Sequence, residues 1–300
     1  MNNLSPKILV HGANSAQGSP VVSRLLQAGY QVRVFVRDHD KAQSLFPKNV
    51  EIVTGTLEDK DSLERANEGI ERVFLVLPLE YRFDIATIQG HNAIEAARNA
   101  GVQLLVFNTS TSIPQQITDA AAFEIKREIQ QYLYQSGIPF IVLRPPVYMD
   151  NLASPWSLPS IVYQSVVAYP LPDNVKVPWI SLDDTAALAA TALAHPELAG
   201  STFDIGGFEA VSGQEIAKQF TRVLGRPFTY QEIPIDAFEQ GLNQAFGEPT
   251  GTEIAKIYRW RATHPEDGVV NMGSVLQKLP VKLTAFEQWI RYTDWSGNSI

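Results

Sequence analysis

The stretch Ile8-Leu9-Val10-His11-Gly12-Ala13-Asn14-Ser15-Ala16-Gln17-Gly18-Ser19-Pro20 decides the fold of this 300-residue chain. Its apolar beginning, residues 8–10, predicts a buried strand, and a tight glycine turn follows it. A helix comes next, with Ser19 expected as the N-cap and Pro20 in the first turn, where a missing N–H costs nothing. We expect this helix to end at Gly29.

The glycine turn carries two of the three glycines of the usual dinucleotide-binding pattern. Gly12 and Gly18 hold the outer positions, and Ser15 stands where a middle glycine would let the backbone approach a phosphate. The free N–H groups and the positive dipole end of the following helix favour a pyrophosphate. Taken alone, the turn fits phosphate binding and an ordinary strand–helix connection equally well, so the rest of the chain has to decide.

The second expected strand, residues 31–36, is followed at once by a basic residue. Arg37 lies about 20 residues past the glycine turn, where this fold places the group that meets the adenosine ribose. An acid there prefers the free 2′-hydroxyl of NAD, whereas an arginine pairs with the 2′-phosphate of NADP. Lys41 follows one turn later, so we expect NADP(H) to be favoured over NAD(H). In the alternative interpretation, Arg37 is a solvated loop charge and Asp38 caps the next helix.

Strands and helices alternate through the first half of the chain. Apolar runs predict strands at 50–54, 73–77, 104–107 and 140–143, and helical spacing predicts helices at 61–67, 85–100 and 123–134. This order predicts an α/β fold with a doubly wound parallel Rossmann sheet. Ligands of such sheets bind beyond the carboxyl ends of the strands, so the residues after the fourth strand, Pro78 and Leu79, are expected to line a cofactor cleft.

The pattern changes after Asp150. Residues 153–172 look like cleft-lining loops with one helix, and short strands are expected at 178–181, 202–205 and 228–233. Helices are expected at 183–194, 236–245 and 253–261, and capping boxes at Ser212 with Glu215 and at Thr284 with Glu287. We therefore expect a Rossmann domain at 1–150, completed by parts of 175–205, and a smaller α/β substrate domain mainly at 151–300.

Composition limits the function. The chain has 24 Lys and Arg against 32 Asp and Glu, a formal net charge of -8, and no basic run, which argues against a nucleic-acid surface. It has no cysteine, and its five histidines show no paired spacing, so we expect no metal site. His11 is expected to pack at a strand end. The polar start and the absence of a long apolar stretch predict a cytoplasmic protein that is not bound to a membrane.

Short motifs along nearly the whole chain carry a resemblance. They are Gly12-Ala13 with Gln17-Gly18, Val36-Arg37-Asp38, Gly55-Thr56-Leu57-Glu58-Asp59, Ala100-Gly101-Val102, Phe123-Glu124-Ile125-Lys126, Ser136-Gly137-Ile138-Pro139, Leu143-Arg144-Pro145 with Asp150-Asn151, Ile180-Ser181-Leu182-Asp183-Asp184-Thr185-Ala186, Ser212-Gly213-Gln214-Glu215-Ile216-Ala217 and Leu283-Thr284-Ala285-Phe286-Glu287-Gln288-Trp289. In this order they resemble the NmrA-like family of atypical short-chain dehydrogenases/reductases. The resemblance implies an NAD(P)-binding Rossmann fold.

The resemblance also implies a set of cofactor contacts. They are Gly12, Asn14, Ser15, Ala16, Gln17, Gly18, Arg37, Lys41, Thr56, Leu57, Leu77, Pro78, Leu79, Thr109, Lys126, Pro145 and Val147. Thr56 stands where the family often has an aspartate that faces the adenine.

The catalytic Tyr-x-x-x-Lys pair of short-chain dehydrogenases is incomplete. Lys126 is present, but Ala122 occupies the tyrosine position, so ordinary carbonyl reduction lacks its acid. Reduction of a quinone is less demanding and mainly needs the nicotinamide beside a flat apolar acceptor. Lys126, Ser110 and Tyr148 are the candidate catalytic residues, although Ser110 could be a helix-entry hydroxyl and Tyr148 could simply pack.

Four aromatic residues could form an acceptor wall or belong only to the core, namely Trp156, Tyr163, Tyr169 and Trp179. Two functions stay open. The first is an NAD(P)H-dependent reductase of a small-molecule, quinone-like acceptor. The second is a dinucleotide-binding redox sensor that acts through a protein partner. Lys126 favours the enzyme and Ala122 the sensor. The oligomeric state is not determined, and a homodimer is one option.

Overall fold

A seven-stranded parallel sheet forms the centre of the molecule. The computed structural model describes residues 5–296. The strand order is β3-β2-β1-β4-β5-β6-β8, and each neighbouring pair is parallel. The strands are β1 (Lys7–His11), β2 (Gln31–Val36), β3 (Glu51–Thr54), β4 (Arg72–Val76), β5 (Leu104–Asn108), β6 (Phe140–Arg144) and β8 (Ser201–Asp204). The order reverses between β1 and β4, which is the switch point of a doubly wound α/β sheet.

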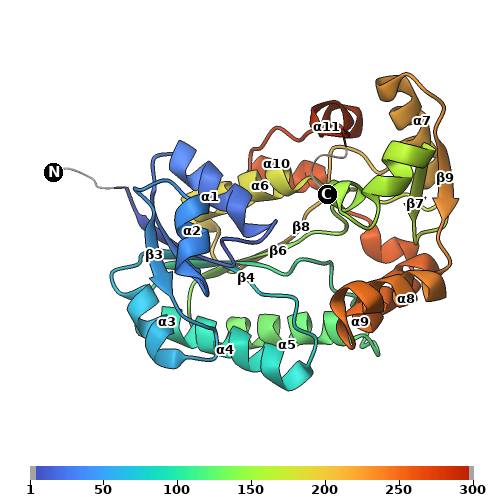
Figure 1. Cartoon of the computed structure of the whole chain (residues 1–300). Helices are drawn as coiled ribbons and strands as arrows, with labels where there is room; N and C mark the ends of the chain where they lie inside the picture. The colour runs from blue at the N-terminus through green and yellow to red at the C-terminus, as the bar shows by residue number, and fades with distance from the viewer. Residues whose placement is uncertain (1–4, 297–300) are drawn as a thin grey trace.

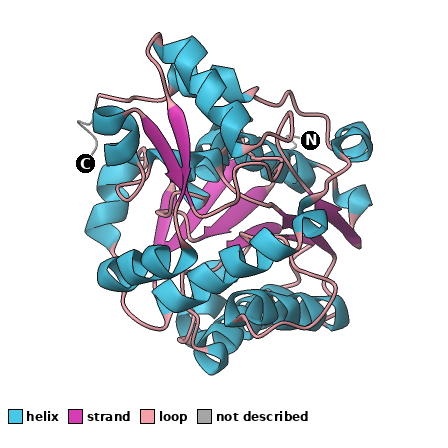
Figure 2. Ribbon diagram, turned by 90° about the vertical axis from the view of Figure 1, so that its right-hand side faces the viewer, coloured by secondary structure: helices cyan, strands magenta, loops and turns pink. Residues whose placement is uncertain are grey.

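Helices cover both faces of this sheet (Figures 1 and 2). One face carries α1 (Gly18–Gln27), α2 (His39–Leu45) and α6 (Leu182–Ala194), and the other carries α3 (Lys60–Asn67), α4 (Phe83–Asn99) and α5 (Ala121–Gln135). Alternate residues of β1 supply the two cores, because successive side chains of a strand point to opposite faces. Ile8 and Val10 join the apolar cluster under α1 and α6, and Leu9 joins the cluster under α3 to α5.

Close packing explains both glycines of the turn after β1. Gly12 has a positive φ of 66°, and a Cβ there would lie 2.7 Å from Cγ1 of Val76. A Cβ on Gly18 would lie 2.2 Å from the carbonyl oxygen of Gly12. The turn therefore brings α1 against the strand ends closely enough to exclude any side chain at either position.

The expected N-cap of α1 is wrong. The helix begins at Gly18, so Ser19 lies inside its first turn, and the N-cap Gln17 makes no side-chain capping bond. The Oγ of Ser15 instead accepts a hydrogen bond of 3.0 Å from the N–H of Gly18. The helix therefore begins one residue before the expected N-cap, because the side chain of Ser15 already binds the N–H of Gly18.

The C-terminal part has its own two-stranded parallel sheet, β7 (Val166–Tyr169) with β9 (Thr229–Glu232). The helices of this part are α7 (Gly213–Leu224), α8 (Ile235–Phe246), α9 (Thr250–Thr263), α10 (Met272–Lys278) and α11 (Phe286–Tyr292). Short helical turns lie at η1 (Met149–Ala153), η2 (Ser160–Gln164), η3 (Pro196–Leu198) and η4 (Pro265–Gly268). A third apolar cluster lies here, built around Tyr169, Phe220 and Phe286. The division at residue 150 remains a proposal, and β8 and α6 from the second half pack onto the main sheet.

Several local expectations in the second half need correction. Residues 178–181 form no strand, since only isolated bridges join Ile180 to Tyr148 and Val177 to Val211. Residues 153–172 are not only loops with a helix, because they include β7, whose partner β9 is distant in sequence.

The second expected capping box is also wrong. The N–H and Oγ1 of Thr284 both donate to the carboxylate of Asp184, each over 2.9 Å, and α11 begins only at Phe286. The first capping box, between Ser212 and Glu215, is confirmed at the start of α7. The sequence did not indicate α10.

Candidate active site

A cavity of about 360 Å³ lies beyond the carboxyl ends of β1, β4, β5 and β6. The main sheet contributes the residues that follow these strands, and α5 contributes Ala122 and Lys126. The opposite wall comes from the C-terminal part and is mostly apolar: Trp156, Phe238, Leu242, Phe246, Ile254, Ile257 and Tyr258. The position agrees with the general rule for open α/β sheets, in which ligands bind at the switch point.

The structure brings about half of the expected cofactor contacts to this cavity. The ones that line it are Ser15, Ala16, Gln17, Leu77, Pro78, Leu79, Thr109, Lys126 and Val147. The others do not line it: Gly12, Asn14, Gly18, Arg37, Lys41, Thr56, Leu57 and Pro145. Gly12 and Gly18 shape the turn beneath the cavity, and the neighbouring Pro146 lines it in place of the buried Pro145.

The two basic residues after β2 are exposed. The side chains of Arg37 and Lys41 form no ion pair or hydrogen bond within residues 5–296. The carboxylate of Asp38 accepts a hydrogen bond of 3.0 Å from the N–H of Lys41 and so caps α2. Asp38 is thus used locally, while the two basic groups remain available for a ligand.

A partly buried hydrogen-bond network joins the glycine turn to the segments that end β5 and follow β6. The Oε1 of Gln17 accepts from the hydroxyl of Tyr148 at 2.9 Å and from Nδ2 of Asn108 at 3.0 Å. Burial raises the pKa of Tyr148, so its hydroxyl stays protonated near neutrality. Asn108 was not anticipated, although a polar residue that ends an apolar strand is a usable signal.

Ser110 follows this network with a strained backbone. Its φ of 64° lies in the left-handed region, which a residue with a side chain seldom adopts. The N–H of Ser110 donates to Oδ1 of Asn108 at 3.0 Å, and the residue lines the cavity. Strain of this kind gathers at functional sites, where the surroundings hold it in place.

Lys126 is buried in the cavity wall without a partner. Its relative exposure is 7%, and its ammonium group makes no ion pair or hydrogen bond among the described residues. Burial lowers the pKa of Lys126 to about 8. Ala122, one turn earlier on α5, lines the same cavity. The position of the missing tyrosine therefore faces the site and offers no hydroxyl.

Arg261 is a cavity residue that the sequence did not indicate. It comes from α9 and has a relative exposure of 9%. Its Nη2 donates to Oγ1 of Thr111 at 2.9 Å and to Oγ of Ser112 at 3.2 Å. It lies 150 residues from Thr111 in sequence, and no local pattern connects them.

The aromatic wall differs from the expected one. Trp156 lines the cavity, but Tyr169 and Trp179 are buried in the third apolar cluster and Tyr163 is 72% exposed. The hydroxyl of Tyr169 is hydrogen-bonded to that of Tyr258 at 2.6 Å. Tyr258 and Phe238 take the places at the wall, because α8 and α9 face the cavity.

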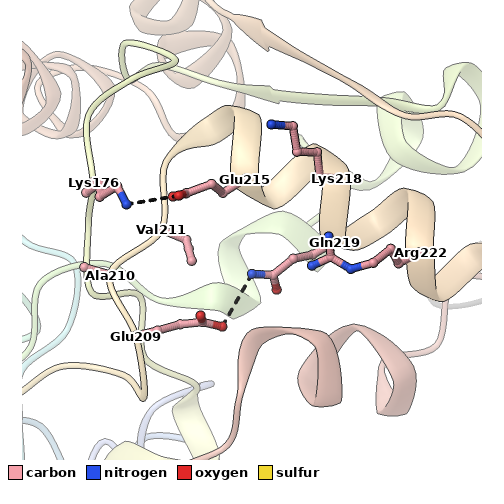
Figure 3. A pocket seen from close by; sticks show the side chains of 8 residues that line it. All are labelled: Lys176, Glu209, Ala210, Val211, Glu215, Lys218, Gln219 and Arg222. Atoms are coloured by element: carbon pink, nitrogen blue, oxygen red, sulfur yellow. Dashed lines mark hydrogen bonds and ion pairs between the residues drawn. The ribbon is translucent and has the colours of Figure 1, made fainter.

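A second hollow, of about 280 Å³, lies along α7 and is lined mainly by charged residues (Figure 3). Lys176 pairs with Glu215 at 3.0 Å, and Gln219 donates to Glu209 at 3.4 Å. None of the expected site residues lines it. The larger cavity is therefore the candidate active site.

His11 is packed at the end of β1, as expected. Both ring nitrogens are buried without a hydrogen-bond partner among the described residues, and the ring meets Phe35 edge-on. Burial lowers the pKa of His11 to about 4, so the ring is neutral at physiological pH. No group of three or more His, Cys, Asp or Glu within residues 5–296 could hold a metal ion. No helix in that range is long and apolar enough to cross a membrane.

The model of the NmrA-like family matches residues 5–290. The chain belongs to the NmrA-like family. A (4-alkanoyl-5-oxo-2,5-dihydrofuran-3-yl)methyl phosphate reductase from Streptomyces griseus is 30% identical over 94% of this chain and 96% of its own. The NAD(P)H azoreductase of Xenophilus azovorans is 31% identical over 78% of this chain and 80% of its own.

A solved structure gives a third comparison for this NmrA-like chain. The NADPH-dependent quinone oxidoreductase QOR2 from Escherichia coli, complexed with NADPH, has a TM-score of 0.77 and 23% identity. The match covers 94% of this chain and 98% of that one. At this identity the likeness shows the shared fold.

The cavity of this NmrA-like protein has the features that a nicotinamide dinucleotide needs. Ala16 and Gln17 line it, and their backbone N–H groups have no partner in the described part of the chain. They stand at the N-terminus of α1, where the helix dipole attracts phosphate. The unpaired Lys126 lies in the same cavity. The residues present therefore fit the group that the family implies.

Proposed function

We propose that this protein is an NAD(P)H-dependent reductase that transfers a hydride to a quinone-like or other flat conjugated acceptor. One observation carries the proposal: Lys126, buried and without a partner among the described residues, shares a cavity with the turn that precedes α1 and with an apolar wall. The names of three related proteins support it, since they describe reductases of an oxodihydrofuran, an azo compound and a quinone.

The strand ends would hold the dinucleotide. The N–H groups of Ala16 and Gln17 would bind the pyrophosphate, and Lys126 would bind the nicotinamide ribose. Arg37 and Lys41, exposed and without ion-pair partners, would meet a 2′-phosphate, which favours NADP(H) over NAD(H). Bound NADPH supplies a hydride at its nicotinamide ring.

The acid–base groups favour an acceptor that needs little protonation by the protein. Ala122 has no hydroxyl, and the proton of Tyr148 is directed to Gln17. Tyr148 therefore positions the turn and the strand end rather than donating to an acceptor in this arrangement. Lys126, with its pKa lowered to about 8, can hold or release a proton near neutrality beside the developing negative charge. The free hydroxyl of Ser110 can donate a hydrogen bond to an acceptor oxygen.

The apolar wall determines the shape of the acceptor. Trp156, Phe238 and Ile257 present flat or branched apolar surface opposite the strand ends. Such a wall binds a conjugated ring by burial of apolar area and excludes water from the reacting atoms. A small ketone would gain little from this surface and would lack the tyrosine acid of the usual mechanism, since Ala122 stands at that position.

A second function is favoured by one residue. Ala122 removes the acid of the usual mechanism, as expected in a regulator that binds the dinucleotide without turning it over. Oxidation of NADPH with a panel of quinones, azo dyes and simple ketones distinguishes the two. The reductase shows turnover with quinones or azo dyes and little with ketones. Stoichiometric NADPH binding with no turnover of any acceptor would exclude the reductase and support the regulator. The homodimer remains a prediction.

A further inference from the structure

We infer that Arg261 recognises an acidic oxygen group, a sulfonate or a carboxylate, on the acceptor. The inference rests on the proposed reductase function and specifies its substrate class: a flat conjugated molecule that carries an anionic substituent. Arg261 would be a specificity-determining residue that touches the substrate at a point away from the reacting atoms.

The guanidinium of Arg261 is buried with too few partners. Its Nη2 contacts only the neutral hydroxyls of Thr111 and Ser112, and its Nε is buried with no hydrogen-bond partner among the described residues. It forms no ion pair in that part of the chain. A buried cation without a carboxylate partner is costly, and an incoming anion can offset that cost.

The residues that line the cavity carry an excess of positive charge. Two of its lining residues are basic, Lys126 and Arg261, and none of them is Asp or Glu. One acid, Asp267, acts electrostatically on Arg261, and its carboxylate accepts a hydrogen bond of 2.6 Å from Nε1 of Trp260. Asp267 does not line the cavity. The cavity is therefore suited to a ligand that brings negative charge.

The dinucleotide does not account for Arg261. The residues expected to contact the dinucleotide follow β1, β4, β5 and β6 or lie on α5, whereas Arg261 comes from α9 in the C-terminal part. Arg261 shares its side of the cavity with the residues of the apolar wall, among them Ile257 and Tyr258 on the same helix. A guanidinium at the edge of an apolar wall is matched by an aromatic ring with an anionic substituent, since the planar donors pair with carboxylate-like oxygens.

A binding experiment tests this without requiring turnover. Naphthalene-2-sulfonate and the neutral, similarly shaped naphthalene-2-sulfonamide are titrated calorimetrically into the full-length protein, with and without NADP⁺. We expect the wild type to bind the sulfonate at least about tenfold more tightly, the scale of one charge-assisted hydrogen bond. Arg261→Met should remove this preference and leave sulfonamide binding within about twofold.

Matched variants separate recognition from a structural role. Arg259→Met removes a half-buried arginine of the same helix that is paired with Asp236 and Glu239 and does not line the cavity, and it should keep the sulfonate preference. Arg261→Gln keeps an amide donor for Thr111 and Ser112 but lacks the charge. It replaces Arg261→Met in the titration if the methionine variant does not fold. Arg261→Lys should restore part of the preference, because it restores the charge.

Three outcomes would overturn the inference. The wild type could bind the two ligands with equal affinity, or the sulfonate preference could survive in both uncharged variants. The variants could also lose affinity for both ligands equally, which would show that Arg261 only stabilises the position of α9. Turnover is measured separately with 1,2-naphthoquinone-4-sulfonate. A sulfonate preference without any turnover would support the anion site and overturn only the reductase assignment.

Discussion

The hydroxyl of Tyr148 donates to Oε1 of Gln17 over 2.9 Å, which joins the segment after β6 to the turn after β1. The same oxygen accepts from Asn108 at the end of β5. Three segments that are far apart in sequence thus meet at one amide side chain beneath the cavity. Asn108 and Tyr148 are buried and Gln17 is partly buried, and the hydrogen bonds among them hold this edge of the site in place.

Arg37 should determine the choice of dinucleotide. Arg37→Ala should reduce the preference for NADPH over NADH by about 1.5–3 kcal/mol, or about 10- to 150-fold, because a charge-assisted hydrogen bond to the 2′-phosphate is lost. Titration by tryptophan quenching measures both affinities. Arg98→Ala, which removes another exposed arginine at the end of α4, is the control and should change neither. Equal affinity of the wild type for both dinucleotides would contradict the prediction.

Ser15 should tolerate only a small residue. Ser15→Gly removes the hydroxyl that accepts from Gly18, so it should cost a few tenths of a kcal/mol in stability while keeping or improving dinucleotide affinity. Ser15→Leu should abolish binding, since its side chain blocks the approach of a phosphate to the turn. Calorimetric titration with NADPH measures both. Unchanged affinity in the leucine variant would place the dinucleotide elsewhere.

Lys126 should be required for turnover. Lys126→Met should lower the rate with a quinone by roughly one to four orders of magnitude, the scale of a lost acid or orienting group. Ala122 and Tyr148 do not supply an acid, so neither of them replaces Lys126. Steady-state NADPH oxidation is the measurement, and thermal unfolding confirms that the variant is folded. A variant that turns over at the wild-type rate would show that another residue has this role.

The same substitution should stabilise the fold near neutral pH. Burial lowers the pKa of Lys126 to about 8 from 10.5, so the unfolded chain binds an extra proton between these values and wild-type stability rises with pH there. Below pH 8 the buried charge costs up to about 3 kcal/mol, which Lys126→Met removes. Urea unfolding at pH 7 and pH 9.5 should therefore show an advantage of the methionine variant that shrinks with rising pH. An advantage that grows with pH would reverse the sign and contradict the burial argument.

His11 should limit stability in acid. Its pKa is lowered from 6.5 to about 4, so the unfolded chain binds more protons in this window and stability falls as the pH drops from 6.5 towards 4. The loss attributable to His11 is up to about 3 kcal/mol. His11→Leu should make the fall from pH 7 to pH 4.5 shallower in urea unfolding. His39→Leu, which changes an exposed histidine, should leave the slope as in the wild type.

Local sequence patterns determined the architecture of this protein. The apolar runs around Val10, Leu75 and Val106 form strands buried on both faces, and their alternation with helices leaves a parallel doubly wound sheet as the arrangement that covers them. The glycines at 12 and 18 marked the strand-to-helix turn, and Ser212 with Glu215 marked the start of α7. These signals are local, since periodicity, turns and caps depend on residues within a few positions.

The site required the tertiary structure wherever its parts are distant in sequence. Gln17, Asn108 and Tyr148 meet only because parallel strands bring their carboxyl ends to one edge. Arg261 reaches Thr111 only after α9 folds over the cavity, and β7 pairs with β9, in which Val166 lies opposite Thr229 from a distant part of the sequence. Burial, which leaves Lys126 and Arg261 without ion-pair partners within residues 5–296, is a property of the assembled walls. The sequence by itself therefore determined the sheet, its turn and the candidate lysine, while packing alone decided which charges are buried together and which surface an acceptor meets.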